Sequence, residues 1–169
     1  VVAHYRDQGF EPAFRLPDSP LFEATARALH AAGLHREQPT LTQIATVSDV
    51  LALPGGMGTK LIAQPDAGWT AMFLGEGLDP VDGASRAAAL ARAQGNLFAC
   101  VVEDGQTVAC GAASYSHGWL GVHGMRTAAA RRGQGLAARV LRTMAAEAQR
   151  QGIARVFLQV DAGNLAAQA

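Results

Sequence analysis

The chain lacks several features that would assign it to common functional classes. Two of its 169 residues are cysteines, Cys100 and Cys110, which argues against a disulfide framework or a cysteine-based metal site. Fourteen Lys and Arg residues balance fourteen Asp and Glu residues. Because the net charge is zero, no long-range field attracts nucleic acid or an anionic membrane, and any anion site must be local.

Long apolar runs are also missing. No stretch approaches the roughly 20 consecutive apolar residues of a membrane span, and the N-terminus shows no charged region followed by an apolar one. We therefore expect a cytoplasmic protein with no membrane partner and no metal cofactor. The composition, 49% hydrophobic and 17% charged, suits one globular domain or one domain with part of a second.

A glycine-rich run is the feature that the sequence does have. Arg132-Gly133-Gln134-Gly135-Leu136-Ala137 lies between a predicted strand and a predicted amphipathic helix. The start of a helix leaves backbone N–H groups without partners, and glycines let a phosphate approach them closely. This run therefore predicts an anion cradle suited to a pyrophosphate.

The flanking segments predict a strand, helix, strand unit. Residues 119–127 are typical of a strand, with two glycines that allow a bulge or the approach of a ligand. Apolar residues then recur at helical spacing: Leu136, Val140, Leu141, Met144, Ala145 and Ala148. Gly152 ends this helix and residues 155–160 form the next strand, so the crossover should be right-handed and the two strands parallel.

These motifs resemble the GNAT superfamily of acyl-CoA-dependent N-acyltransferases. The family signature Q/R-x-x-G-x-G/A opens the helix after the fourth strand, and Arg132, Gly135 and Ala137 occupy its specified positions. Residues 159–167 give a second match, because they look like the fifth strand followed by the Asn-x-x-Ala opening of the next helix. The two matches occur in the family's order and at about its spacing.

The resemblance implies an α/β (α+β) fold with a mixed, mostly antiparallel sheet, a parallel strand–helix–strand crossover and acetyl-CoA as cosubstrate. The two parallel strands would splay apart and admit the pantetheine arm. Its partners would be the backbone of Met125, Arg126 and Thr127, and the side chain of Asn164 from the opposite side. The pyrophosphate would be held by Arg132, Gly133, Gln134, Gly135, Leu136 and Ala137. Asn164 is read equally well as an ordinary helix N-cap, and Arg131 as a phosphate contact or a solvated side chain.

Transfer of an acetyl group to an amine needs a group that accepts a proton. Members of the family often use a Glu, but no Glu or Asp lies between Gly105 and Arg126. His123, on the strand beside the expected thioester, is the best substitute, because an unperturbed imidazole has a pKa of about 6.5. His117 and Tyr115 are weaker candidates. A structural role for His123 is the competing interpretation.

The first 50 residues are predicted to form a unit of their own. A helix ends near Gly9, a strand covers residues 11–16, and a helix over residues 21–32 starts after Ser19 and Pro20 and is closed by Gly33. Residues 40–47 suit a strand. This partial β-α-β unit resembles half of a second, degenerate GNAT domain, as in tandem members of the family, with the acetyltransferase domain over residues 51–169.

Residues 48–78 are the hardest part to interpret. Pro54-Gly-Gly-Met-Gly-Thr-Lys60 invites comparison with a P-loop, but Lys60 follows Thr59, whereas the motif requires Gly-Lys and then Ser or Thr, so a flexible turn is favoured. Strands are predicted over residues 61–63 and 69–74, and a helix over 80–94. A hairpin over residues 97–114 turns at Asp104-Gly105.

The sequence starts without Met and stops in an expected helix, before the Tyr and the strand that the family usually carries next. We expect either a longer protein or a catalytic acid from elsewhere. The leading hypothesis is an acetyl-CoA-dependent N-acetyltransferase that acetylates a primary amine by direct attack in a ternary complex. A non-catalytic acyl-CoA-binding regulatory module and another nucleotide-binding α/β domain are the alternatives. The acceptor, a small-molecule or peptide amine, and a homodimeric state are left open.

Overall fold

The computed structural model describes residues 1–56, 59–75 and 77–168. The chain divides into two compact units, Val1–Pro39 and the remainder from Thr40 onward. The second unit holds the sheet and all the predicted site residues. None of the helices in the described part of the chain has the length and apolar character that a membrane crossing requires.

The first unit contains only short helices: α1 (Val2–Asp7), the 3-10 helix η1 (Pro20–Phe22) and α2 (Glu23–Ala31). The predicted helix start is confirmed, because the Ser19 hydroxyl accepts a hydrogen bond from the Leu21 N–H at 3.4 Å and Pro20 follows it. The strand predicted over residues 11–16 is wrong. No described residue of this unit is buried, so a strand there has no sheet to join.

The second unit is built on a six-stranded sheet with the order β1-β6-β5-β4-β3-β2. The strands are β1 (Thr40–Thr46), β2 (Lys60–Ile62), β3 (Asn96–Glu103), β4 (Gln106–Ser116), β5 (Trp119–Thr127) and β6 (Arg155–Asp161). All neighbours are antiparallel except β5 and β6, which are parallel. The predicted α/β class, the hairpin and the parallel crossover are therefore confirmed.

β1 belongs to the compact unit that carries the main sheet. β1 pairs antiparallel with β6 along its whole length, from Thr40 opposite Asp161 to Thr46 opposite Arg155. The units therefore divide between Pro39 and Thr40, because backbone hydrogen bonds tie β1 to the main sheet, and residue 50 falls inside α3 (Val47–Leu51). The relation of the first segment to a second GNAT domain stays a prediction.

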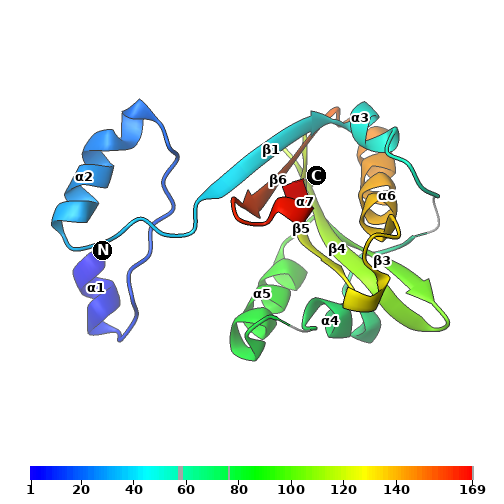
Figure 1. Cartoon of the computed structure of the whole chain (residues 1–169), viewed down its shortest axis with the longest axis horizontal. Helices are drawn as coiled ribbons and strands as arrows, with labels where there is room; N and C mark the ends of the chain where they lie inside the picture. Colours follow the sequence, from blue (N-terminus) through cyan, green and yellow to red (C-terminus); the bar gives the residue numbers. More distant parts are fainter. Residues whose placement is uncertain (57–58, 76, 169) are drawn as a thin grey trace. The chain divides into compact units, whose positions relative to one another are not determined.

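Helices cover both faces of the sheet. On one face lies α6 (Leu136–Arg150) (Figure 1). Its Val140, Met144 and Ala145 pack against apolar residues of β3, β4 and β5. On the other face lie α4 (Ala67–Phe73) and α5 (Pro80–Arg92). A short helix, α7 (Leu165–Gln168), follows β6. The sheet thus has an α6 face and an α4 face. Each face carries its own cluster of buried apolar residues, one packed against α6 and the other against α4 and α5.

The strand predicted over residues 69–74 is wrong, since residues 69–73 belong to α4 and Leu74 is its C-cap. The Asp66 carboxylate accepts a hydrogen bond from the Trp69 N–H at 2.8 Å and starts the helix. Trp69 then stacks on Phe73 with ring centroids 4.9 Å apart, and its indole N–H donates to the Gly111 carbonyl. The local sequence fits either a strand or a helix, and the packing of these two rings against β4 selects the helix.

Candidate functional site

The start of α6 differs from the starts of the other α-helices of the second unit. Thr46, Asp66, Asp79 and Asn164 each accept a backbone N–H at the start of α3, α4, α5 and α7. Helix α6 starts at Leu136, and its N-cap residue, Gly135, provides no side-chain cap. The N–H groups of its first turn have no acceptor within the helix, so they and the positive end of the helix dipole are available to an anion.

The backbone of the preceding loop has the form that a phosphate cradle needs. Gly133 and Gly135 both have φ of +73°, a left-handed conformation that favours glycine. A Cβ atom built on either residue meets no heavy atom within 4 Å. The space above both glycines is therefore open, and Gln134, Gly135 and Ala137 are exposed beside it. The residues present fit a diphosphate approaching the backbone.

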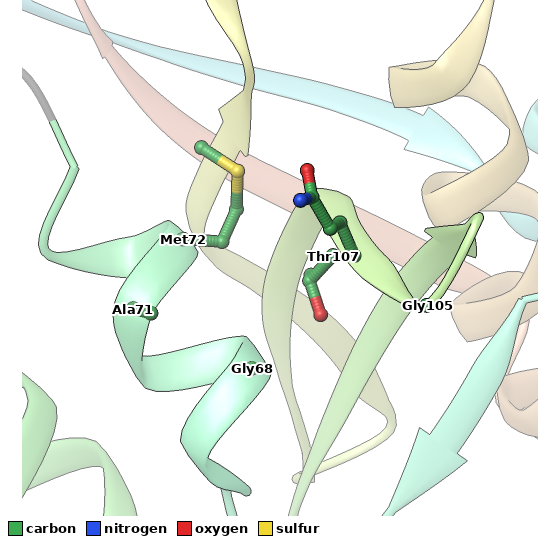
Figure 2. Close-up of a pocket in the computed structure, with 6 residues that line it drawn as sticks. Gly68, Ala71, Met72, Gly105 and Thr107 are labelled. Carbon is green, nitrogen blue, oxygen red and sulfur yellow. The ribbon is translucent and has the colours of Figure 1, made fainter.

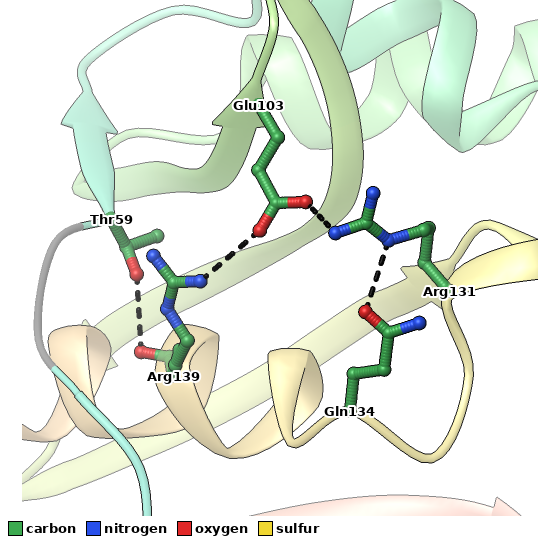
Figure 3. A network of polar contacts seen from close by, with 5 residues as sticks. All are labelled: Thr59, Glu103, Arg131, Gln134 and Arg139. Carbon is green, nitrogen blue, oxygen red and sulfur yellow. Dashed lines mark hydrogen bonds and ion pairs between the residues drawn. The ribbon is translucent and has the colours of Figure 1, made fainter.

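A polar network braces this loop from the neighbouring strand (Figure 3). The Glu103 carboxylate, at the end of β3, forms an ion pair with Arg131, in the 3-10 helix η2 (Ala129–Arg131), and a second one with Arg139 at 3.5 Å. The Arg131 Nε donates to the Gln134 side-chain oxygen at 3.0 Å. Arg131 is thus tied to protein groups rather than only solvated, and it links β3 to the residue between the two glycines.

The strand β5 carries the predicted bulge. Its register with β4 shifts between Cys110 opposite Arg126 and Ala112 opposite His123, and Gly124 in between has φ of +58°. A Cβ atom on Gly124 would lie 2.6 Å from a ring carbon of Phe73, so only glycine fits there. The bulge separates His123 from the predicted backbone contacts.

The predicted contact residues Met125, Arg126 and Thr127 form the end of β5. Met125 packs toward the core and the Arg126 side chain donates to the Gly75 carbonyl at 3.4 Å. The parallel ladder with β6 ends at Val122 opposite Leu158, although β5 continues to Thr127. Beyond that point no described strand pairs with the β6-facing edge of β5. The backbone N–H and C=O groups along this edge of residues 123–127 are thus available to pair with a pantetheine arm.

His123 is the first residue after the ladder ends. It is half-buried, and its Nε2 lies 3.1 Å from the Ser114 hydroxyl oxygen. That hydroxyl also donates to the Gly121 carbonyl at 3.5 Å. Because a hydroxyl has one proton to give, this arrangement favours an imidazole that donates from Nε2 and keeps Nδ1 free to accept a proton. Burial lowers the pKa of His123 below its usual value.

The other predicted residues are placed differently. Asn164 Oδ1 accepts the Ala167 N–H at 3.2 Å, so its role as an N-cap is seen directly. The Tyr115 hydroxyl donates to the Met144 carbonyl, and burial raises its pKa, which makes it a poor proton carrier. His117 is exposed in the turn between β4 and β5. The structure therefore leaves His123 as the titratable candidate beside the open edge of β5.

A pocket of about 360 Å³ lies elsewhere, between α4 and the β3–β4 hairpin (Figure 2). It is lined by Gly68, Ala71, Met72, Gly105, Gln106 and Thr107. None of these side chains is ionisable, so the pocket offers no acid or base. Among the described residues there is also no group of three or more His, Cys, Asp or Glu side chains that could hold a metal.

The family model of the acetyltransferase (GNAT) family matches residues 68–169, which is more than half of the chain. The chain belongs to the GNAT family. It is accordingly an acyl-CoA-dependent N-acyltransferase. None of the curated proteins compared with the chain matches it.

Solved structures support the GNAT fold. A putative acyl-CoA N-acyltransferase from Klebsiella pneumoniae is 22% identical, with a TM-score of 0.55 over 66% of this chain and 76% of the other. An aminoglycoside antibiotic 6′-N-acetyltransferase from Acinetobacter haemolyticus is 16% identical, with a TM-score of 0.53 over 66% and 85%. A protein of unknown function from Staphylococcus epidermidis is 9% identical, with a TM-score of 0.59 over 98% and 68%.

Sequence reasoning missed two residues of this GNAT site. Glu103 is far from Arg131 and Arg139 in the sequence, and no local sequence pattern predicts the ion pairs that it forms with them. Ser114 could have been predicted, because the short turn between β4 and β5 sets a register that places Ser114 opposite Gly121, two residues before His123 on the same face.

Proposed function

We propose that this GNAT protein transfers the acetyl group of acetyl-CoA to a primary amine by direct attack in a ternary complex. The observation that carries the proposal is the open edge of β5, which lies between an uncapped helix start and a half-buried histidine. Acetyl-CoA supplies an acetyl group activated as a thioester. All other steps fall to the chain's own residues.

Binding of the cosubstrate is assigned to the backbone. The N–H groups of Gly133–Ala137 and the dipole of α6 would hold the pyrophosphate, and the exposed Arg132 guanidinium would add a charge-assisted contact. Glu103 positions this loop through Arg131 and Gln134. The backbone of Met125–Thr127 would pair with the pantetheine arm. Asn164, whose carbonyl oxygen caps α7, would approach the arm with its amide from the β6 side.

Proton transfer is assigned to His123. The amine nitrogen forms a C–N bond to the acetyl carbonyl carbon, the C–S bond to CoA breaks, and CoA leaves as a thiolate that takes a proton from water. The proton that the amine loses goes to Nδ1 of His123, directly or through one water. Ser114 orients the ring through Nε2. Because burial lowers the pKa of His123, the imidazole is mostly neutral at pH 7 and ready to accept a proton.

The cosubstrate assignment is tested by thermal melting with acetyl-CoA, CoA and ATP. A ligand that binds only the folded state at a hundredfold excess over its Kd adds about 2.7 kcal/mol of stability, so the melt should rise clearly with acetyl-CoA. Gly135→Val places a side chain in the open space of the cradle and should abolish most of this rise. An unchanged melt of the parent protein at millimolar acetyl-CoA contradicts the assignment.

The catalytic assignment needs a separate measurement, the release of CoA thiol with a panel of amines. Thiol release that depends on a particular amine supports the transferase. Tight acetyl-CoA binding with no amine-dependent release across the panel instead supports a non-catalytic acyl-CoA-binding module. The two experiments together separate binding from chemistry.

A further inference from the structure

The site leaves one face of the sheet for the acceptor amine. This step rests on the proposed function, which places the thioester beside the end of the β5–β6 ladder. On the α6 face that position is filled, because Leu120 and Val122 of β5 pack with Val140 and Met144 in the core. Side chains alternate along a strand, so Trp119, Gly121 and His123 point to the α4 face. The acceptor must approach from there.

Aromatic rings gather on that face where the ladder ends. Trp119 and Phe157 make an edge contact with centroids 6.1 Å apart, and His123 and Phe157 make another at 6.2 Å. All three side chains are half-buried. Gly121 lies among them, and a Cβ atom there would come within 3.0 Å of the Phe157 ring. The small residue lets Phe157 lean across β5 beside the proposed base.

The strand β1 extends this apolar surface. Ile44 lies directly opposite Phe157 in the β1–β6 register and is 70% exposed. On the same face Gln159 donates to the Thr42 hydroxyl at 3.5 Å, so the flank beyond Phe157 is polar but uncharged. Trp119, Phe157 and Ile44 thus form an apolar row across three strands, which we call the aromatic row.

The charge near the aromatic row is positive. The Arg155 guanidinium lies 5.5 Å from the centroid of the Trp119 ring. Among the described residues Arg155 forms no ion pair that would neutralise it. Asp161, at the far end of β6 on the same face, uses its Oδ1 to accept the Gly163 N–H. The Asp49 carboxylate accepts hydrogen bonds from the Thr46 N–H and hydroxyl, and Thr46 lies opposite Arg155. A polycationic acceptor would therefore meet a guanidinium beside the rings, while both carboxylates named here are engaged by protein donors.

We propose that the acceptor is a small primary monoamine that carries an aromatic or branched apolar group, bound against the aromatic row with its nitrogen toward His123. The rings and Ile44 supply apolar contact area, while Arg155 disfavours acceptors with several positive charges. An acceptor of the aminoglycoside kind, which carries several amines, is disfavoured by the same charge.

The first test compares kcat/KM for 2-phenylethylamine, n-propylamine, spermidine and kanamycin with acetyl-CoA. Burial of a phenyl ring against the row should favour 2-phenylethylamine over n-propylamine at least tenfold. Equal values for these two amines, or a preference for spermidine or kanamycin, would overturn this inference and leave the proposed function standing. Absence of acetylation with every amine would overturn both.

The second test changes the row without touching the core. Ile44→Ser should raise KM for 2-phenylethylamine about three- to tenfold and leave kcat and the n-propylamine kinetics nearly unchanged. Leu41→Ser is the matched control, because Leu41 is 44% exposed on the opposite face of the same strand. Equal effects of the two substitutions contradict an acceptor surface at Ile44.

The third test addresses the charge. Arg155→Glu should raise kcat/KM for spermidine relative to 2-phenylethylamine at least fivefold at low salt. Arg150→Glu, which makes the same change of net charge at the end of α6, should leave the ratio unchanged. A ratio that does not respond to Arg155→Glu shows that the acceptor does not pass this residue, and it overturns the argument from charge.

Discussion

The two halves of β5 differ in their strand pairing and in the groups that they expose. From Trp119 to Val122 the strand is paired on both sides, and its side chains alternate between the core and the aromatic row. From His123 to Thr127 it bulges, loses its pairing with β6 and leads into the two left-handed glycines. Residues 119–123, with His123 at the junction, present side chains, whereas residues 124–127 present backbone. Substitutions in the two regions should therefore separate turnover from cosubstrate affinity.

The largest expected effect lies at the junction of the halves. His123→Ala should lower kcat at saturating acetyl-CoA by about 10² to 10⁴, because it removes the proton acceptor. Its Kd for acetyl-CoA, measured by calorimetry, should stay within about twofold. His123→Asn, which keeps a hydrogen bond to Ser114, should be nearly as slow. A His123→Ala variant with the parent's rate and pH profile would make this residue structural.

The second largest effect belongs to the cradle. Arg132→Ala should raise the Kd for CoA about ten- to a hundredfold, because it removes a charge-assisted contact of about 1.5 to 3 kcal/mol, while kcat at saturation changes little. Arg150→Ala, at the other end of α6, is the control and should leave the Kd unchanged. Equal losses with CoA and with a pantetheine fragment that lacks the diphosphate would contradict the cradle.

The pH dependence of turnover follows from the burial of His123. Protonated imidazole cannot accept a proton, so kcat should fall about tenfold per pH unit below the pKa of this group. Burial lowers that pKa, hence the fall should begin below the usual value of about 6.5. A pH profile of kcat at saturating substrates checks this. A limb centred above 6.5, or one retained by His123→Ala, belongs to another group.

The smallest effect tests how the loop is positioned. Glu103→Gln should raise the Kd for acetyl-CoA about three- to tenfold, because Arg131 loses the carboxylate that orients it toward Gln134. The melt without ligand should change little, since partly exposed ion pairs contribute about 0 to 1 kcal/mol. Glu147→Gln, which breaks the ion pair with Arg150, is the control. Tighter binding by Glu103→Gln would show that Glu103 competes with phosphate for Arg131.

The sequence predicted those parts of the site that depend on local chemistry. Gly133, Gly135 and the crossover were found because positive φ, helix spacing and strand pattern leave local signals. The ion pairs of Glu103 were not predictable, because they depend on how β3 and α6 come together in space.

The two incorrect strand predictions, over residues 69–74 and 11–16, have related causes. The short apolar run around Trp69 fits either a strand or a helix, although Asp66 and Gly75 mark both ends of a helix. Residues 11–16 have a strand-like pattern but no partner strand in their unit. In both cases tertiary context, which a local pattern does not contain, decided the outcome.

The pairing of β1 with β6 has a consequence for how the chain folds. Residues 40–46 pair with residues 155–161, so this ladder closes a loop that contains all of residues 47–154. Loop closure on that scale costs entropy before any contact repays it, and such long-range pairing slows folding. During synthesis β1 emerges early and waits unpaired until β6 has been made. The β3–β4 hairpin and α6 depend on local contacts, so we expect them to form first. The pairing of β1 with β6 should form last.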